Sequence, residues 1–297
     1  MPAATPLDIR RKIRSVQKTQ QITKAMKMVA AARLRRAETK MRAERPYSAT
    51  MNDFVRQMLP SLAAASEENP LLHARPAKAV GVIVITADRG LCGAFNANII
   101  RRAEELMKER PDLAYVLFCL GRKGAYYFLR RHRNVRSEYT DLYRSASLPM
   151  AAAIIQQAAS SYLEGRIDEL QLVHASFRNV AVHPVVTRTL LPLKIETVFG
   201  EQPPPAGQMQ EDAHFEFEPD IFYLGEVLLE KYISHELYHA LLESFASELG
   251  ARMTAMDSAT NNAQEVVEML TLEYNNLRQA SITREIVEIA STAEAMK

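Results

Sequence analysis

The sequence predicts an α/β domain inserted between two long helices that pair as an antiparallel coiled coil. The first observation is the final third of the chain, Asp220 to about Glu288, where no proline follows Pro219 and only Gly225 and Gly250 occur. The second is a similar stretch without strong helix breakers near the N-terminus. The third is an alternation of strand and helix patterns between them, which favours a mostly parallel, Rossmann-like sheet covered by helices.

The first helix has a clear start signal. Thr5 can cap it, Pro6 suits the first helical position, and Asp8 follows three residues after the cap. The helical pattern continues to Arg45, and we expect Pro46 to interrupt the helix before it resumes.

Both arms carry the apolar repeat of a coiled coil. In the C-terminal helix the steps average about 3.5 residues, the period of a left-handed supercoil. The members of this seam are Leu242, Phe245, Leu249, Met253, Met256, Ala259, Ala263, Val266, Leu270, Tyr274 and Leu277. The first arm, which is long enough to be its partner, has a stripe with a slip near Gln20. The members of that stripe are Ile9, Ile13, Val16, Ile22, Met26, Val29, Ala37 and Met41.

The first arm is also strongly basic. Between Arg10 and Arg45 it holds thirteen Lys and Arg residues against two acids, a net charge of +11, whereas the whole chain carries +2. A solvated helix face would account for a smaller excess. So large a local charge indicates a partner with a concentrated negative surface, such as acidic protein loops, anionic lipid or nucleic acid. The arm has no nucleic-acid recognition motif and no interleaved aromatic residues, which disfavours the last of these.

The predicted organisation has five parts: an N-terminal arm, a linker, an α/β domain, a proline-rich connector and a C-terminal helix. Their expected bounds are 1–60, 61–76, 77–200, 201–219 and 220–297. Inside the domain we expect strands at 80–86, 114–120, 135–139, 170–176 and 180–190. We expect helices at 96–110, 122–131 and 150–163.

The composition is typical of a soluble globular protein, with 47% hydrophobic and 24% charged residues. Two cysteines, Cys92 and Cys119, are too few for a disulfide scaffold and fit a reducing compartment. The N-terminus lacks the apolar core of a secretory signal, and no apolar run is long enough to predict a membrane span.

Two segments suggest chemistry, and a plainer interpretation competes with each. In the turn 88–93, two glycines could face a ligand and Cys92 could be a nucleophile, although turn geometry and a packed thiol explain them equally well. His235 and His239 form an H-E-x-x-H motif, with Glu243 as a further candidate zinc ligand. A zinc peptidase therefore stays an alternative. The helix continues through a heptad seam without a visible pocket, which favours a solvated helix face.

Near the end of the chain, segment 283–294 combines apolar and small residues. Its apolar members are Ile286, Val287, Ile289 and Ala290. A protruding apolar tip indicates insertion into a hydrophobic socket. Burial against the chain's own N-terminal arm is the other possibility, and the two are compatible.

Four blocks of sequence resemble one family. They read IRRKIRSVQKTQQITKAMKMVAAARLRRAE, ITADRGLCGAFN, ARMTAMDSATNNAQE and YNNLRQASITREIVEI. In order and spacing, over essentially the whole chain, they resemble the γ subunit of the F-type rotary ATP synthase. Two features depart from the pattern of this family. Ala94 stands where the family often has glycine, and the proline-rich connector at 200–213 could not be matched to it. An inserted dithiol pair is not visible in the sequence, so redox regulation is not expected.

The resemblance implies the central shaft of a proton-driven synthase, without a catalytic site, bound nucleotide, metal or cofactor of its own. One copy would sit inside three α and three β subunits. The central domain would lie beside the ring of membrane c subunits, with ε alongside and without nucleic acid. A peripheral position on the cytoplasmic face of a bacterial plasma membrane follows from the same resemblance. The driving ion and the direction of operation stay open.

The resemblance also assigns contact residues by motif match. Contacts with the α/β hexamer would be Met26, Lys27, Arg252, Gln279, Thr283 and Glu288. Glu218, in the FEFEP segment, would meet the polar loops of the c ring. For each residue, a coiled-coil or surface role is the plainer alternative. A structural coiled-coil adaptor would share the two arms but would not need the four blocks.

Overall fold

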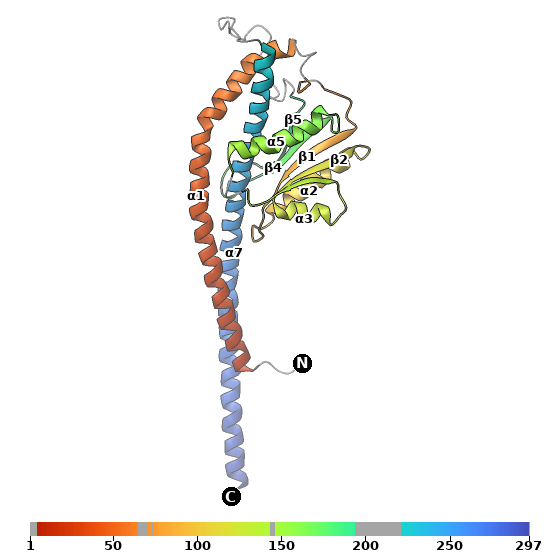
Figure 1. The fold of residues 1–297 in the computed structure, drawn as a ribbon. Helices are drawn as coiled ribbons and strands as arrows, with labels where there is room; N and C mark the ends of the chain where they lie inside the picture. Colours follow the sequence, from red (N-terminus) through yellow and green to blue (C-terminus); the bar gives the residue numbers. More distant parts are fainter. Residues whose placement is uncertain (1–4, 65–69, 73, 143–145, 194–220, 297) are drawn as a thin grey trace. The chain divides into compact units, whose positions relative to one another are not determined.

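The computed structural model describes residues 5–296, apart from 65–69, 73, 143–145 and 194–220. The connector expected at 201–219, which includes Glu218, therefore lies wholly outside the described residues. The chain divides into two compact units. Residues 1–32 and 252–297 form unit 1, and residues 33–251 form unit 2. Two long helices, α1 (Pro6–Ala64) and α7 (Ile221–Ala295), contribute to both units (Figure 1).

The first turn of α1 confirms the predicted start signal. The Asp8 amide donates to Thr5 Oγ1 at 3.3 Å, and the Thr5 amide donates to the Asp8 carboxylate at 3.3 Å. Pro6 is the first helical residue. An N–H group at that position would have no intrahelical acceptor, so proline costs the helix no hydrogen bond. The hydrogen bond from the Thr5 hydroxyl lowers the pKa of Asp8. This reciprocal cap satisfies amides that the first turn leaves open.

The predicted interruption of the first helix at Pro46 is wrong, because α1 is continuous across it. A proline inside a helix removes one N–H donor and crowds the preceding turn. Here the turns on both sides are held by packing, since Met41, Val55 and Met58 are buried in the core of unit 2. Tertiary burial outweighs the local cost of the proline.

Unit 2 contains a five-stranded sheet in the order β3-β2-β1-β4-β5. The strands are β1 (Ala79–Ile85), β2 (Ala114–Leu120), β3 (Val135–Tyr139), β4 (Glu169–Ala175) and β5 (Val185–Leu191). The crossover helices are α2 (Phe95–Glu109), α3 (Arg122–Leu129) and α5 (Leu148–Leu163). Four strands are parallel, whereas β5 is antiparallel to β4. The loop before β5 is shorter than the dozen or more residues that a parallel crossover needs.

The sheet has an apolar core on each face. On one face α2 and α3 pack against the strands, and on the other face lie α5 and the unit 2 portions of α1 and α7 (Figure 1). The central strand β1 is consequently buried on both sides, which explains its continuous apolar sequence. Between Leu229 and Ala251, α7 is buried on almost every side.

A close backbone crossing joins the carboxyl ends of β1 and β2. Gly121 has a φ of 101°, and a Cβ atom there would lie 2.0 Å from the Thr86 carbonyl oxygen. The Thr86 amide donates to the Leu120 carbonyl at 2.7 Å, and the Gly124 amide donates to Thr86 Oγ1 at 2.9 Å. Glycine is required here both by conformation and by space.

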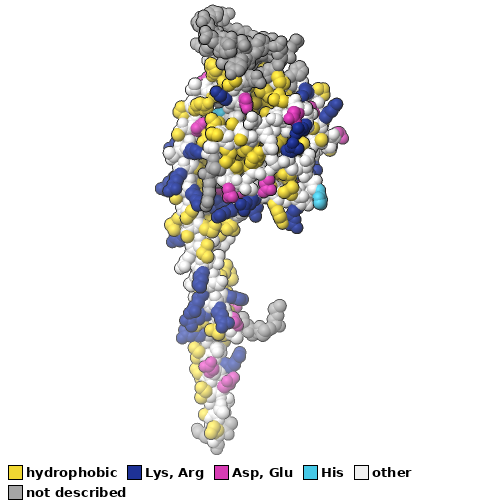
Figure 2. Space-filling view, viewed as in Figure 1, with side chains coloured by type: hydrophobic (Ala, Val, Ile, Leu, Met, Phe, Trp, Pro, Cys, Tyr) yellow, Lys and Arg dark blue, Asp and Glu magenta, His cyan; other side chains and the backbone are white. Residues whose placement is uncertain are grey.

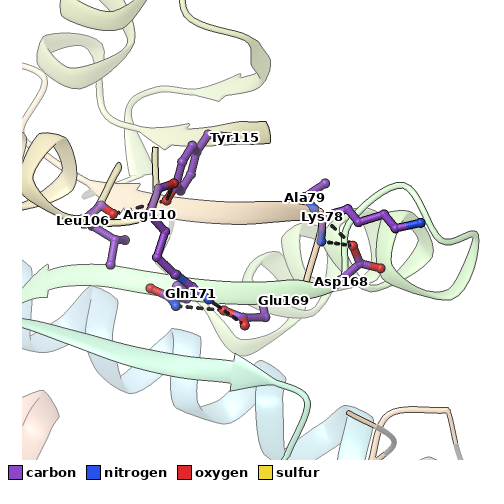
Figure 3. Close-up of polar contacts among 8 residues, drawn as sticks. All are labelled: Lys78, Ala79, Leu106, Arg110, Tyr115, Asp168, Glu169 and Gln171. Carbon is purple, nitrogen blue, oxygen red and sulfur yellow. Dashed lines mark hydrogen bonds and ion pairs between the residues drawn. The ribbon is translucent and has the colours of Figure 1, made fainter. Parts of the chain in front are cut away.

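Polar side chains connect β4 with α2 and with the start of β1 (Figure 3). Arg110 forms a two-point ion pair with Glu169, with nitrogen–oxygen distances of 2.9 and 2.6 Å. The Asp168 carboxylate accepts hydrogen bonds from the backbone amides of Lys78 at 2.8 Å and Ala79 at 3.1 Å. These amide bonds stabilise the carboxylate and lower the pKa of Asp168.

Candidate partner interface

Unit 1 is an antiparallel helix pair whose inward positions alternate in steps of four and three. On α1 these buried or half-buried positions are Ile9, Ile13, Val16, Gln20, Thr23, Lys27 and Ala30. On α7 they include Met256, Thr260, Ala263, Val267, Leu270, Tyr274 and Leu277. The period of 3.5 residues is that of a left-handed coiled coil, which confirms the predicted pairing of the two arms.

Three successive layers of this seam are polar. Gln20 Nε2 donates to Gln264 Oε1 at 2.8 Å, and the Thr23 and Thr260 hydroxyl oxygens lie 2.8 Å apart. In the third layer, Lys27 Nζ lies 2.5 Å from the Asp257 carboxylate. As the residue number rises along α1 it falls along α7, so these contacts fix an antiparallel register. Polar pairs in a coiled-coil seam specify register because a slipped pairing leaves them without partners.

The predicted slip of the α1 stripe near Gln20 is wrong. Ile22 is 60% exposed and Val29 is 52% exposed, so neither belongs to the seam. The heptad instead passes through the polar residues Gln20 and Thr23, which a search for apolar residues alone does not find. On α7, Val266 is likewise exposed, and Val267 takes the inward position.

Most cations of the first arm in unit 1 are not neutralised by an acidic side chain of the described residues. Of its cations in unit 1, two form ion pairs within the described part of the chain: Lys27 with Asp257, and Arg11 with Asp8 at 4.0 Å. Five others have no acidic partner among the described residues: Arg10, Lys12, Arg14, Lys18 and Lys24. Figure 2 shows dark-blue Lys and Arg side chains interspersed with hydrophobic ones along this helix pair. Such a surface favours an acidic partner with some apolar contact area.

Three of the predicted contact residues lie near the polar layers. Met26 and Lys27 are half-buried on α1, and Lys27 itself forms the third layer. Arg252 is half-buried on α7, five residues before Asp257. The structure thus places Lys27 partly inside the helix pair, where a pairing role and a contact role are both open to it.

The other predicted contacts lie where α7 continues past the start of α1. Gln279, Thr283 and Glu288 are exposed, and the Thr283 hydroxyl donates to the Gln279 carbonyl at 2.9 Å. Gln279 and Thr283 share a helix face, whereas Glu288 lies about 180° from Gln279 at roughly 100° per residue. These residues therefore lie on two opposite faces of the helix and do not form a single patch.

This end of α7 exposes its apolar residues. By the register of the polar layers, the first residue of α1, Pro6, lies opposite a position near residue 278 of α7. Beyond it, Ile286 is 60% exposed, Val287 is 59% exposed and Ile289 is 70% exposed. Burial of these residues against the N-terminal arm is thus not observed within the described residues, and the surface suits insertion into an apolar socket.

The H-E-x-x-H segment is not a solvated helix face, which corrects that interpretation. His235 is buried and its Nε2 lies 2.7 Å from a Glu44 carboxylate oxygen. Glu243 is bound by His174 Nε2 at 3.2 Å and by the Ser176 hydroxyl at 3.3 Å. His235 and Glu243 therefore contact different partners, Glu44 on α1 and His174 on β4. Among the described residues, no group of three or more His, Cys, Asp or Glu side chains is arranged to hold a metal ion.

Cys92 is a packed thiol, as one of the two interpretations predicted. It is buried, and Asn96 Nδ2 donates to its sulfur at 3.2 Å. Cys119 is also buried, which raises the pKa of its thiol to about 12. Neither thiol is therefore suited to act as an exposed nucleophile.

None of the helices, as far as the described residues go, has an apolar stretch long enough to cross a bilayer.

Comparison with known proteins gives matches along the whole chain. The family model described as "ATP synthase" matches residues 5–296. An ATP synthase gamma chain from Heliobacterium modesticaldum is 43% identical over 97% of this chain and 98% of its own length. One from Moorella thermoacetica is 41% identical over 98% of each chain.

Solved structures show the same fold. A chain of the central stalk/c-ring structure of the Tetrahymena thermophila mitochondrial ATP synthase is 27% identical, with a TM-score of 0.63. That match covers 80% of this chain and 99% of the other. A chain of the Euglena gracilis mitochondrial ATP synthase is 21% identical, with a TM-score of 0.72 over 98% of this chain and 94% of the other. From the family model and these full-length relatives, the chain belongs to the ATP synthase gamma chain family.

Proposed function

We propose that this chain is the central rotor shaft of a proton-driven ATP synthase, transmitting torque from a membrane c ring to a catalytic hexamer of α and β subunits. The family supports a non-catalytic subunit of the synthase, and the Tetrahymena thermophila neighbour belongs to a central stalk and c-ring assembly. The observation that carries the proposal is the helix pair of unit 1. It combines a fixed antiparallel register with an apolar end of α7 that extends past α1.

The shaft function gives each part of unit 1 a role. The unpartnered cations of α1 would face acidic surfaces of the β subunits, because opposite charges attract without demanding one fixed geometry. The exposed apolar end of α7 would turn inside an apolar sleeve, where few directional bonds oppose rotation. Met26, Lys27, Arg252, Gln279, Thr283 and Glu288 are the proposed hexamer contacts.

The remaining segments would connect the shaft to the membrane motor. The α/β domain, proposed as 77–200, would form the foot beside the c ring and an ε subunit. Glu218, in the connector proposed as 201–219, would contact the polar loops of the c ring. We place the complex on the cytoplasmic face of a bacterial plasma membrane, with this chain as a peripheral subunit that binds no nucleotide, metal or nucleic acid.

Rotation of a probe on this chain would test the function directly. Both native cysteines are buried, so a Lys108→Cys variant offers one accessible thiol on an exposed turn of α2. In a complex anchored through its β subunits, we expect a bead attached there to rotate stepwise during ATP hydrolysis. A bead attached to an α subunit is the matched control and is expected not to rotate.

The same preparation tests the composition of the complex. Native mass spectrometry is expected to give one copy of this chain with three α and three β subunits. Continued ATP hydrolysis by a complex whose bead at position 108 stays still would reject the shaft role, even if that composition is found.

A further inference from the structure

A basic groove lies between α2 and α3 in unit 2. It encloses about 560 Å³. Its residues are Asn96, Ala97, Ile100, Arg101, Glu104, Lys123, Tyr126, Tyr127, Arg130 and Arg131. Four of these side chains are cations and one is a carboxylate, so the groove carries a net positive charge.

The charge of the groove is not neutralised within the described part of the protein. The only carboxylate among the groove residues, that of Glu104, accepts a hydrogen bond from the Tyr127 hydroxyl at 2.8 Å. None of its four cations forms an ion pair with a described Asp or Glu residue. By contrast, other arginines of the same unit do so, including Arg102 with Glu109 and Arg110 with Glu169.

Two tyrosine rings hold the groove arginines in place. The Arg131 guanidinium lies 3.6 Å from the centre of the Tyr127 ring, and the Arg130 guanidinium lies 5.1 Å from that of Tyr126. Arg130 also donates to the Tyr126 hydroxyl at 2.8 Å. Stacking of this kind restricts the side chains, so a ligand loses less conformational entropy in binding them. Tyr126 is nevertheless 61% exposed, which leaves an apolar surface in reach of a ligand.

The spacing of the cations indicates an extended ligand. Lys123 and Arg130 are separated by seven residues of helix and helical turn, roughly 10 Å at 1.5 Å per residue. One phosphate group is too small to contact both ends of such a row. An extended polypeptide advances about 3.3 Å per residue, so three or four of its residues would span the groove.

We propose that this groove, defined by the α2 and α3 residues above, binds an acidic segment of a partner protein. The segment lies along the two helices, its carboxylates meet Arg101, Lys123, Arg130 and Arg131, and an apolar side chain packs on Tyr126. Charge complementarity selects this occupant, since four cations without acidic partners among the described residues lie beside an exposed aromatic ring. The site is independent of the shaft proposal, because the peptide assay below needs only the full-length chain.

The absence of tryptophan from the sequence allows a local reporter. A Tyr126→Trp variant places the only tryptophan in the groove, so binding to the basic α1 arm does not give the signal. The probe is an eight-residue peptide of six glutamates and two leucines, and its control replaces every glutamate by glutamine. We expect saturable fluorescence changes with the acidic peptide, weakened by 0.5 M NaCl, and none with the control.

Two double variants of equal charge loss locate the site. Arg130→Gln with Arg131→Gln removes two groove cations and is expected to weaken binding about tenfold, at two- to fivefold per charge. Arg136→Gln with Arg178→Gln removes two exposed cations that do not line the groove, and is expected to leave affinity unchanged. Calorimetry on chains that retain Tyr126 repeats the comparison without the tryptophan, and circular dichroism checks the fold of each variant.

Three results would overturn the proposal. The first is equal weakening by both double variants. The second is loss of the signal in 10 mM inorganic phosphate at constant ionic strength, which would indicate a compact-anion site. The third is a response to vesicles containing phosphatidylglycerol without one to the acidic peptide, which would assign the surface to lipid.

Discussion

Lys27 and Asp257 form an ion pair across the helix pair of unit 1, with the lysine nitrogen 2.5 Å from a carboxylate oxygen. Both side chains are partly exposed, at 40% and 47%. A pair in this position contributes modestly to stability, because water screens it, but strongly to register, because only one alignment brings the two charges together. It lies one turn from the Thr23–Thr260 contact, so the two layers reinforce the same alignment.

Exchanging the two charges would test whether their mutual attraction stabilises the helix pair. Lys27→Asp alone places two carboxylates together, and we expect it to destabilise unit 1 by about 1 kcal/mol. Adding Asp257→Lys restores opposite charges and is expected to recover most of that loss. Hydrogen exchange of the α1 amides in unit 1, followed by mass spectrometry, measures the effect. An exchange rate in the double variant as fast as in Lys27→Asp would contradict this account.

The sequence predicted the sheet of unit 2 well because its evidence is local. Strands buried on both faces, such as β1 and β2, must be continuously apolar, and their crossover helices carry their own amphipathic pattern. The antiparallel partner of α1 was also predictable, since the C-terminal seam required a second helix.

The polar layers could not be found by the same means. Gln20 and Thr23 resemble surface residues until Gln264 and Thr260 are placed opposite them, and that pairing is a property of two helices. The burial of His235 was missed for a related reason. The periodicity of the sequence around His235 does not reveal that α7 is covered by α1 on one side and by the sheet on another. The basic groove likewise depends on the contact between α2 and α3.

The Gly121 position provides a test of the sheet's strand ends. Gly121→Ala would place Cβ 2.0 Å from the Thr86 carbonyl oxygen at a φ of 101°. Because both the overlap and the conformation are unfavourable, we expect unit 2 to lose more than about 3 kcal/mol of unfolding free energy. Gly90→Ala is the matched control, since its Cβ would meet only Lys123 at 4.0 Å. Urea unfolding followed by circular dichroism would show the difference, and similar midpoints for the two variants would refute it.

The Asp168 carboxylate makes a pH-dependent contribution to unit 2. Hydrogen bonds from the Lys78 and Ala79 amides lower its pKa from the ordinary value of 3.8. A lowered pKa in the folded state gives stability that is fully present above the unfolded-state pKa and is lost as pH falls through the folded-state pKa. We expect Asp168→Asn to cost about 2 kcal/mol near pH 7, because two charge-assisted bonds are weakened. The free energies of unfolding of the two proteins should converge as the pH falls below 3.8. A difference that stays constant between about pH 7 and pH 3 would show that ionisation is not involved.

Arg252 provides the sharpest test of a proposed hexamer contact. It is half-buried on α7, and the motif match assigns it to the surface that meets the catalytic subunits. We expect Arg252→Ala to reduce proton-driven ATP synthesis in membrane vesicles severalfold while the amount of assembled complex stays normal. Lys108→Ala, which removes an exposed cation from α2, is the control and should synthesise ATP at the normal rate. Arg252→Lys helps to separate charge from geometry, because lysine keeps the charge but not the planar fork of donors. Normal synthesis by Arg252→Ala would remove this residue from the coupling surface, whereas loss of the assembled complex would assign it a structural role instead.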